Sequence, residues 1–230
     1  MTIEIGMLLF PDLTQLDLTG PFEVLQRVPD ARVHLVWKDR APVMARGGMA
    51  IVPTTRLAEC PPLDVLFVPG GFGQLALQDD DEVLAFLRRE GARAQWVTSV
   101  CTGALLLGAA GLLEGHRATT HWAYTSFLSA FGAEHVDERV VIDRNRVTGG
   151  GVTAGIDFAL VLVAQMIGEE DARAIQLQLE YDPLPPFRSG HPKLADPALT
   201  MRVRERLAPS VEAQRIALEA RRARARTDVR

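Results

Sequence analysis

The stretch WVTSVCTGALLLGAAGLL, residues 96–113, changes at Cys101 from a run rich in β-branched residues to a run of small residues and leucines. The first part predicts a buried strand, and the second predicts a helix that follows without a loop. In open α/β sheets such a junction lies at the carboxyl ends of the strands, the edge at which ligands bind. Cys101 is therefore a candidate functional residue.

Strand-like and helical segments alternate on both sides of this junction. Strands are predicted at residues 3–10, 32–38, 63–68 and 95–100, with hairpins at 48–57 and around Asp143–Asn145. Helices are predicted at residues 16–25, 79–94, 102–113 and 152–168, in an amphipathic segment before Gly132, and from 198 onward. Pro21 is expected in a first helical turn, where its missing N–H costs nothing. This alternation predicts an α/β fold with a mostly parallel sheet and helices on both faces.

The chain shows no internal repeat and no linker that divides it. We expect residues 1–190 to form one α/β domain, with a proline-rich loop at 180–187 near its end. Residues 191–230 are expected to form a helical extension, either part of the same unit or part of a dimer interface. Its terminal arginine cluster is interpreted as a solvated helix end.

Composition and net charge further limit the classes of function, partner and location that we expect. The 230 residues are 47% hydrophobic, which is ample for a core, and the net charge of −4 gives no general reason to expect nucleic acid as a partner. Two cysteines in unrelated contexts indicate neither a disulfide framework nor a metal site, and they favour a reducing compartment. The N-terminus lacks a basic region, and the longest apolar run, 104–113, is too short to span a bilayer. We therefore expect a cytoplasmic protein without a membrane segment.

Two interpretations of Cys101 remain open on the residues alone. A free cysteine is often a small buried apolar residue. At the start of a helix, however, free N–H groups and the helix dipole favour the thiolate and lower the pKa of the thiol. The junction then resembles a nucleophile elbow with sulfur in place of oxygen.

Three further features are candidates for the same edge of the sheet. Asp17 stands between two leucines, and it is either a helix cap or a buried general acid whose pKa is raised. Gly70 and Gly71 follow a predicted strand, and they either turn the chain or direct their N–H groups at a developing anion. His121 competes with Asp17 as the acid–base partner, because Cys–His pairs are the commoner arrangement. Sequence spacing does not decide between them.

Four motifs together resemble a known family. In order and spacing, the segments LLFPDLTQLDLTGPFEVL, DVLFVPGGFG, VTSVCTGALLLGAAGLLEGHRATTHWAY and RVTGGGVTAGIDFAL are similar to the ThiJ/PfpI superfamily of class I glutamine-amidotransferase-like proteins. The likeness runs from about residue 3 to about 187. Many members carry Glu at the position that corresponds to Asp17. The Asp at this position is similar to the branch of the superfamily that hydrates isonitriles.

The resemblance implies a flavodoxin-like three-layer α/β sandwich that forms a homodimer. It implies Cys101 as the nucleophile on a strained elbow and Asp17 as the paired acid and base, with Thr102, Gly70 and Gly71 lining the site. The implied reaction converts a small-molecule isonitrile to an N-substituted formamide through a thioimidate on Cys101. No metal or organic cofactor is expected.

The same motifs leave three alternatives. The chain resembles other enzymes of the superfamily that hydrate 2-oxoaldehydes, and an oxidisable thiol at Cys101 would suit a redox sensor. Related domains also form the ligand-binding half of transcriptional regulators that continue into a helix-turn-helix region. The residues that follow 190 are expected to be too few for such a region.

Overall fold

The computed structural model describes residues 2–227, with side chains up to residue 224. A seven-stranded sheet has the strand order β10-β11-β7-β6-β1-β2-β5, and only β10 runs antiparallel to its neighbour. The strands are β1 (Ile3–Leu8), β2 (Ala31–Trp37), β5 (Thr55–Arg56), β6 (Val65–Val68), β7 (Trp96–Val100), β10 (Val140–Asp143) and β11 (Arg146–Gly149). Two small pairs stand apart from this sheet: β3 (Val43–Met44) with β4 (Ala50–Ile51), and β8 (Arg117–Ala118) with β9 (Glu134–His135).

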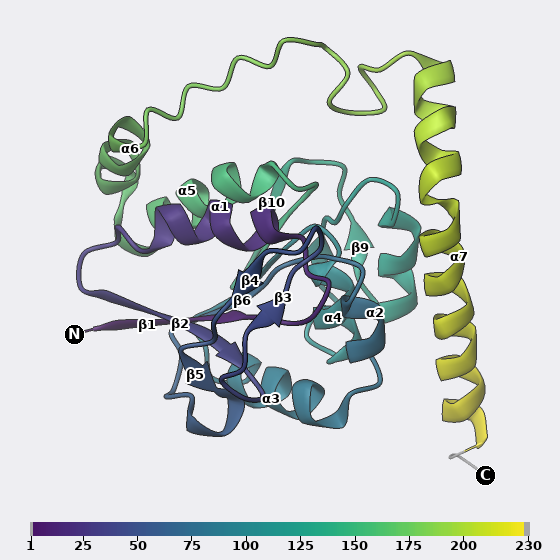
Figure 1. Cartoon of the computed structure of the whole chain (residues 1–230), viewed down its shortest axis with the longest axis horizontal. Helices are drawn as coiled ribbons and strands as arrows, with labels where there is room; N and C mark the ends of the chain where they lie inside the picture. Colours follow the sequence, from purple (N-terminus) through teal and green to yellow (C-terminus); the bar gives the residue numbers. More distant parts are fainter. Residues whose placement is uncertain (1, 228–230) are drawn as a thin grey trace.

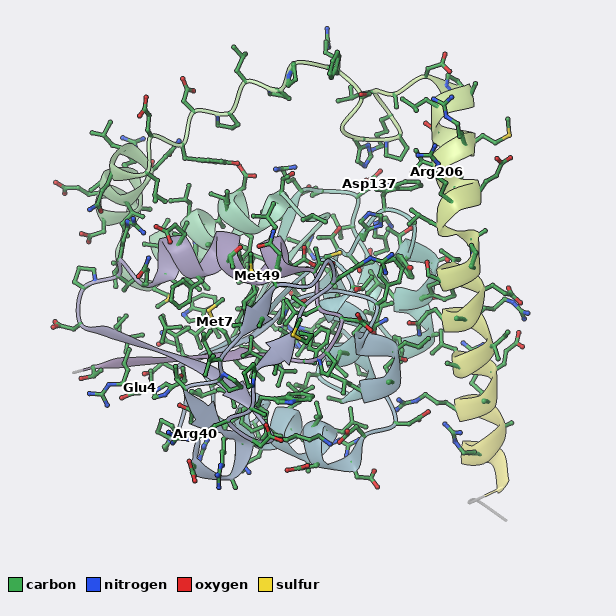
Figure 2. All side chains as sticks on the ribbon, in the orientation of Figure 1. Glu4, Met7, Arg40, Met49, Asp137 and Arg206 are labelled. Atoms are coloured by element: carbon green, nitrogen blue, oxygen red, sulfur yellow. The ribbon has the colours of Figure 1, made fainter. Side chains whose placement is uncertain are left out.

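Helices cover both faces of the sheet, so the predicted flavodoxin-like three-layer architecture is confirmed. In Figure 1, α1 (Gln15–Leu25) and α5 (Ala154–Ile167) lie together on one face, and α3 (Asp81–Gly91) lies on the other. The remaining helical elements are α2 (Gln74–Leu77), α4 (Gly103–Ala109), α6 (Glu169–Gln178), α7 (Pro197–Thr227) and the 3-10 helices Leu57–Glu59 and Thr125–Phe131. Figure 2 shows side chains filling the space around Met7, which is fully buried in the central strand β1.

Three local expectations are corrected. The hairpin expected at 48–57 is not formed, because β4 pairs with β3 and β5 joins the main sheet parallel to β2. Pro21 lies inside α1 rather than in its first turn, and it has no N–H to donate to the carbonyl one turn earlier, that of Asp17. The amphipathic segment before Gly132 is a 3-10 helix rather than an α-helix. The predicted turn at Asp143–Asn145 is confirmed, since β10 and β11 pair on either side of it.

Strand register brings the ends of two central strands together. Val68 of β6 pairs with Ser99 of β7, so the residues that follow each strand emerge side by side. β1 lies on the other side of β6 and leads into α1. The first turn of α1, the turn after β6 and the start of α4 therefore meet at one edge of the sheet.

The C-terminal helix α7 runs along the outside of this domain (Figure 1). It is reached through residues 181–196, which form neither helix nor strand and leave Leu184 and Phe187 largely exposed. Gln214 and Leu218 of α7 are nevertheless buried against the domain. The helix is thus anchored at its middle rather than along the connecting segment.

Candidate active site

Cys101 occupies the strained turn between β7 and α4. Its φ of 53° is left-handed, a conformation that costs a non-glycine residue roughly 1–3 kcal/mol and persists only where neighbours enforce it. The Cys101 N–H donates to the carbonyls of Gly149 (3.1 Å) and Gly150 (2.7 Å). The Thr120 hydroxyl donates to the Cys101 carbonyl at 2.6 Å. These bonds hold the turn on both sides of the cysteine.

Asp17 lies in the first turn of α1 with no solvent exposure. Its Oδ2 accepts a hydrogen bond from the Gly70 N–H at 3.0 Å, and its Oδ1 has no hydrogen-bond partner among the described residues. Burial raises the pKa of the carboxyl to about 7, although hydrogen bonds from Cys101 and Gly70 act in the opposite direction. Asp17 is thus buried with a raised pKa and is not the helix cap, because the N-cap of α1 is Thr14; its role as a general acid stays a prediction.

Gly70 is the point at which these two side chains meet. A Cβ at this position would lie 2.6 Å from Asp17 Oδ2 and 2.7 Å from both the Cβ of Cys101 and the nitrogen of Thr102. Only a residue without a side chain leaves room for the carboxyl and the thiol to approach each other here. The spacing of Asp17 and Cys101 in the sequence does not show that they lie close together. In the structure they meet at the turn after β6.

The amides of the glycine pair are already engaged. The Gly71 N–H donates to Thr102 Oγ1 at 3.0 Å, and the Thr102 hydroxyl lies 3.3 Å from the Gly71 carbonyl. The Gly70 N–H donates to Asp17 Oδ2. Both amides therefore position side chains, which differs from the expectation that they point at a developing anion.

The thiol itself is less acidic than its position at a helix start suggested. Burial and the nearby charge of Asp17 raise the pKa of Cys101 well above its ordinary value, although the N–H and the hydroxyl of Thr102 lower it. The expectation of a lowered pKa is corrected because the thiol is almost sealed from water and lies beside the Asp17 carboxyl. Removal of the thiol proton thus depends on a nearby acceptor, and the Asp17 carboxyl lies within hydrogen-bonding reach of the thiol.

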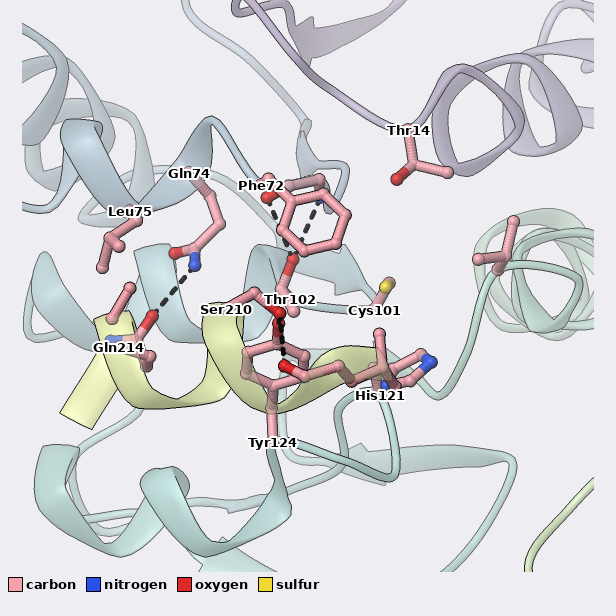
Figure 3. A pocket seen from close by; sticks show the side chains of 14 residues that line it. Thr14, Phe72, Gln74, Leu75, Cys101, Thr102, His121, Tyr124, Ser210 and Gln214 are labelled. Carbon is pink, nitrogen blue, oxygen red and sulfur yellow. Dashed lines mark hydrogen bonds between the residues drawn. The ribbon is translucent and has the colours of Figure 1, made fainter. Parts of the chain in front are cut away.

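A cavity of about 380 Å³ opens in front of Cys101 (Figure 3). Its walls come from the edge of the sheet and from α7: Thr14, Gly71, Phe72, Gln74, Leu75, Cys101, Thr102, His121, Tyr124, Val152, Leu207, Ser210, Ala213 and Gln214. Mostly apolar atoms face the space, and no Asp, Glu, Lys or Arg is among these described lining residues. A cavity of this kind suits a small uncharged molecule.

His121, which the sequence offered as an acid–base candidate, and its neighbour Trp122 differ in their placement. His121 lines the cavity, and burial lowers its pKa to about 4, so its ring is neutral at pH 7. Its Nδ1 lies 3.3 Å from the Ala123 nitrogen, which can donate to it. Trp122 lies beneath the guanidinium of Arg204, 5.1 Å from the ring centre. His121 thus lies at the site as a neutral ring, and no carboxylate of the described residues bonds to it as in a typical catalytic His.

The contribution of α7 was missed by sequence reasoning. One face of this helix is marked in the sequence by residues at helical spacing: Leu207, Ser210, Gln214 and Leu218. Gln214 on this mostly apolar face was the signal that could have indicated a buried polar contact. Within the described part of the chain, no group of His, Cys, Asp and Glu side chains is arranged to hold a metal ion. Nor is any described helix long and apolar enough to cross a membrane.

The sequence model of the DJ-1/PfpI family matches residues 4–165. The chain belongs to the DJ-1/PfpI family. This membership confirms the resemblance found in the motifs, and the matched region contains Asp17, Gly70, Gly71, Cys101 and Thr102.

Individual relatives extend the comparison beyond the DJ-1/PfpI domain. The chain is 55% identical over 212 residues to the isonitrile hydratase of Pseudomonas putida, covering 92% of this chain and 93% of that one. A crystal structure of a ThiJ/PfpI family protein from Pseudomonas syringae superposes with a TM-score of 0.92 at 44% identity, covering 95% and 91% of the two chains. The HTH-type transcriptional regulator GbdR of Pseudomonas aeruginosa is 31% identical over 187 residues, but these are only 51% of the regulator.

Proposed function

We propose that this protein is an isonitrile hydratase, which converts an isonitrile and water to an N-substituted formamide. The observation that carries the proposal is the pairing of Cys101 with a fully buried Asp17 of pKa about 7, at the end of an uncharged cavity. An isonitrile is neutral and reacts at its terminal carbon, which needs both a nucleophile and a proton. Similarity to the isonitrile hydratase of Pseudomonas putida along nearly the whole chain supports the same reaction.

The first step forms a covalent bond at Cys101. Asp17 accepts the thiol proton, the thiolate sulfur adds to the terminal carbon, and Asp17 returns the proton to that carbon. The product is a thioimidate, R–N=CH–S–Cys101, which holds every atom of the substrate and of the thiol. Covalent catalysis divides a difficult hydration into two easier steps.

The second step adds water. The Asp17 carboxylate takes a proton from a water molecule as the water oxygen attacks the thioimidate carbon, and Asp17 then passes that proton to the substrate nitrogen. The tetrahedral intermediate expels the Cys101 thiolate as the C=O bond of the formamide forms. The proton of the hydroxyl group that came from water returns to the pair of Asp17 and Cys101. Thr102, whose N–H and hydroxyl lower the pKa of Cys101, stabilises the sulfur as it leaves.

Assembly and location are part of the same proposal. We expect a homodimer, as the family resemblance implies, and the exposed side chains of Met44, Met49 and Val52 in and beside the β3–β4 hairpin offer apolar surface for a second copy. Sedimentation velocity distinguishes a dimer from a 25.2 kDa monomer. Neither cysteine is in a disulfide, which agrees with a reducing, cytoplasmic location.

A panel of isonitriles, assayed for formamide by chromatography, tests the proposal. Cys101→Ala is expected to abolish turnover, and Asp17→Asn to remove nearly all of it, with circular dichroism and thermal melting showing that both variants fold. Substantial activity in Cys101→Ala would contradict the covalent mechanism. An inactive His121→Ala beside an active Asp17→Asn would show that the acid–base partner is His121.

Three other results would replace the proposed activity. Turnover of methylglyoxal without any turnover of isonitriles would indicate a 2-oxoaldehyde hydratase. Oxidation of Cys101 to the sulfinate by mild peroxide, with no turnover of either class, would indicate a redox sensor. Binding of a small molecule without chemistry would indicate a ligand-binding domain like the one in the regulators.

A further inference from the structure

One wall of the cavity lies outside the part of the chain that matches the DJ-1/PfpI family. The family model ends at residue 165, whereas Leu207, Ser210, Ala213 and Gln214 of α7 line the cavity that contains Cys101. Figure 3 shows α7 crossing the cavity beside Tyr124. The catalytic pair and this wall thus come from different parts of the chain.

A cluster of three buried glutamines fixes the position of α7. Gln74 and Gln78 each donate to Gln214 Oε1 at 3.0 Å, and Gln214 Nε2 donates to Gln78 Oε1 at 3.1 Å. Gln78 also donates to Gln74 Oε1 at 2.7 Å. Each side chain is at most 3% exposed. Because displacement of α7 would leave buried amides unpaired, the cluster holds the helix at one distance from the domain.

The hydroxyl groups on this side of the cavity are satisfied as well. Tyr124 donates to Ser210 Oγ at 2.7 Å, and the Ser210 hydroxyl donates to the Leu207 carbonyl at 2.8 Å. The polar side chains that α7 presents to the cavity, Ser210 and Gln214, are therefore already hydrogen-bonded. Leu207 and Ala213 remain as the purely apolar side chains that α7 presents to the cavity.

We propose that α7 sets the size of the isonitrile substituent that the site accepts, and that Leu207 and Ala213 are specificity-determining residues. This inference rests on the proposed function. The isonitrile group is linear, so a terminal carbon held at Cys101 directs the substituent into the cavity that α7 closes. The catalytic pair acts on the carbon, and α7 limits the volume left for the substituent.

The test compares kcat/KM for ethyl, tert-butyl and cyclohexyl isonitriles. Ala213→Leu adds apolar volume to the wall, and we expect the cyclohexyl-to-ethyl ratio of kcat/KM to fall by at least about tenfold. Leu207→Ala removes volume, and we expect the same ratio to rise by about three- to tenfold. Ala220→Leu makes the matched change on the exposed side of α7 and should leave the ratio at its wild-type value.

The outcomes separate this inference from the proposed function. Ratios that stay at the wild-type value in both Ala213→Leu and Leu207→Ala, with turnover retained, would overturn the role of α7. If the wild-type protein hydrates none of the three compounds, the proposed function fails. The role of α7 as a wall of the cavity is then tested by the rate at which Cys101 is alkylated. Ala213→Leu should then slow the alkylation of Cys101 by N-cyclohexylmaleimide more than by iodoacetamide, as peptide mass spectrometry measures. Equal slowing of the two reagents would overturn the inference.

Discussion

At the scale of the residue, the site depends on two residues, and the conformation of one and the burial of the other each reduce the stability of the folded state. Cys101 has a left-handed backbone conformation, and Asp17 is a carboxyl buried without a partner for one of its oxygens. Neither arrangement benefits the fold alone, since strain and desolvation both oppose folding. Such costs are typical of functional sites, where reactivity is gained at the expense of stability.

Asp17→Asn should stabilise the folded protein in a pH-dependent way. The pKa of Asp17 is raised from 3.8 to about 7, so the folded state favours the neutral acid. Its contribution to the free energy of unfolding is intact below pH 3.8 and is lost as the pH rises through 7. Asparagine has no charge to bury, and at pH 8 the variant should gain up to about 4 kcal/mol over the wild type.

Thermal melting of both proteins between pH 4 and pH 8 measures this difference. The Tm of Asp17→Asn should exceed that of the wild type at pH 8, and the two curves should converge towards pH 4. A difference that stays constant across this range would show that Asp17 does not titrate near pH 7 in the folded protein.

At the scale of the element, the site is built from turns that follow strands. The segment after β6 holds Asp17 through the Gly70 N–H and Thr102 through the Gly71 N–H. These hydrogen bonds tie the turn after β6 to α1 and to the start of α4. The spacing between the thiol and the carboxyl is thus a property of the turns rather than of either side chain.

Gly70→Ala tests this dependence. The added Cβ would meet Asp17 Oδ2 at 2.6 Å and the Cβ of Cys101 at 2.7 Å, so the two side chains must move apart. We expect most formamide production to be lost and the free energy of unfolding to fall by about 1–3 kcal/mol. Gly190→Ala, at a position where the added Cβ meets nothing within 4 Å, is the control and should leave both measurements unchanged. Wild-type activity in Gly70→Ala would contradict the close approach of the pair.

At the scale of the whole molecule, α7 packs against the edge of the sheet that holds Cys101. Besides the glutamine cluster, Arg224 forms an ion pair with Asp79 at 2.8 Å, and Leu218 is buried. We propose that the described part of the extension expected at 191–230, residues 191–227, belongs to the same folding unit as the domain expected at 1–190; residues 228–230 lie outside the described residues. The cavity then exists only when both parts are folded together.

Calorimetry of Gln214→Ala tests this unity. The substitution removes the acceptor of the buried Gln74 Nε2 and the donor to the buried Gln78 Oε1, at a cost of about 1–3 kcal/mol. We expect one unfolding transition, shifted to lower temperature. Ile216→Ala, at a side chain that is 54% exposed on the same helix, should shift it far less. A main transition that does not move in Gln214→Ala would show that α7 is a separate unit.

The sequence by itself determined the elements and the nucleophile candidate. Strand periodicity, the junction at Cys101 and the turn at Asp143–Asn145 depend on neighbouring residues, so local patterns predict them. Only the tertiary structure decided that Asp17 faces Cys101 across Gly70, because three elements distant in the chain meet there. It also reversed the predicted shift in the pKa of Cys101, since desolvation depends on everything packed around the thiol. The wall formed by α7 was decided in the same way, by a buried contact between residues 74–78 and Gln214 that no local pattern specifies.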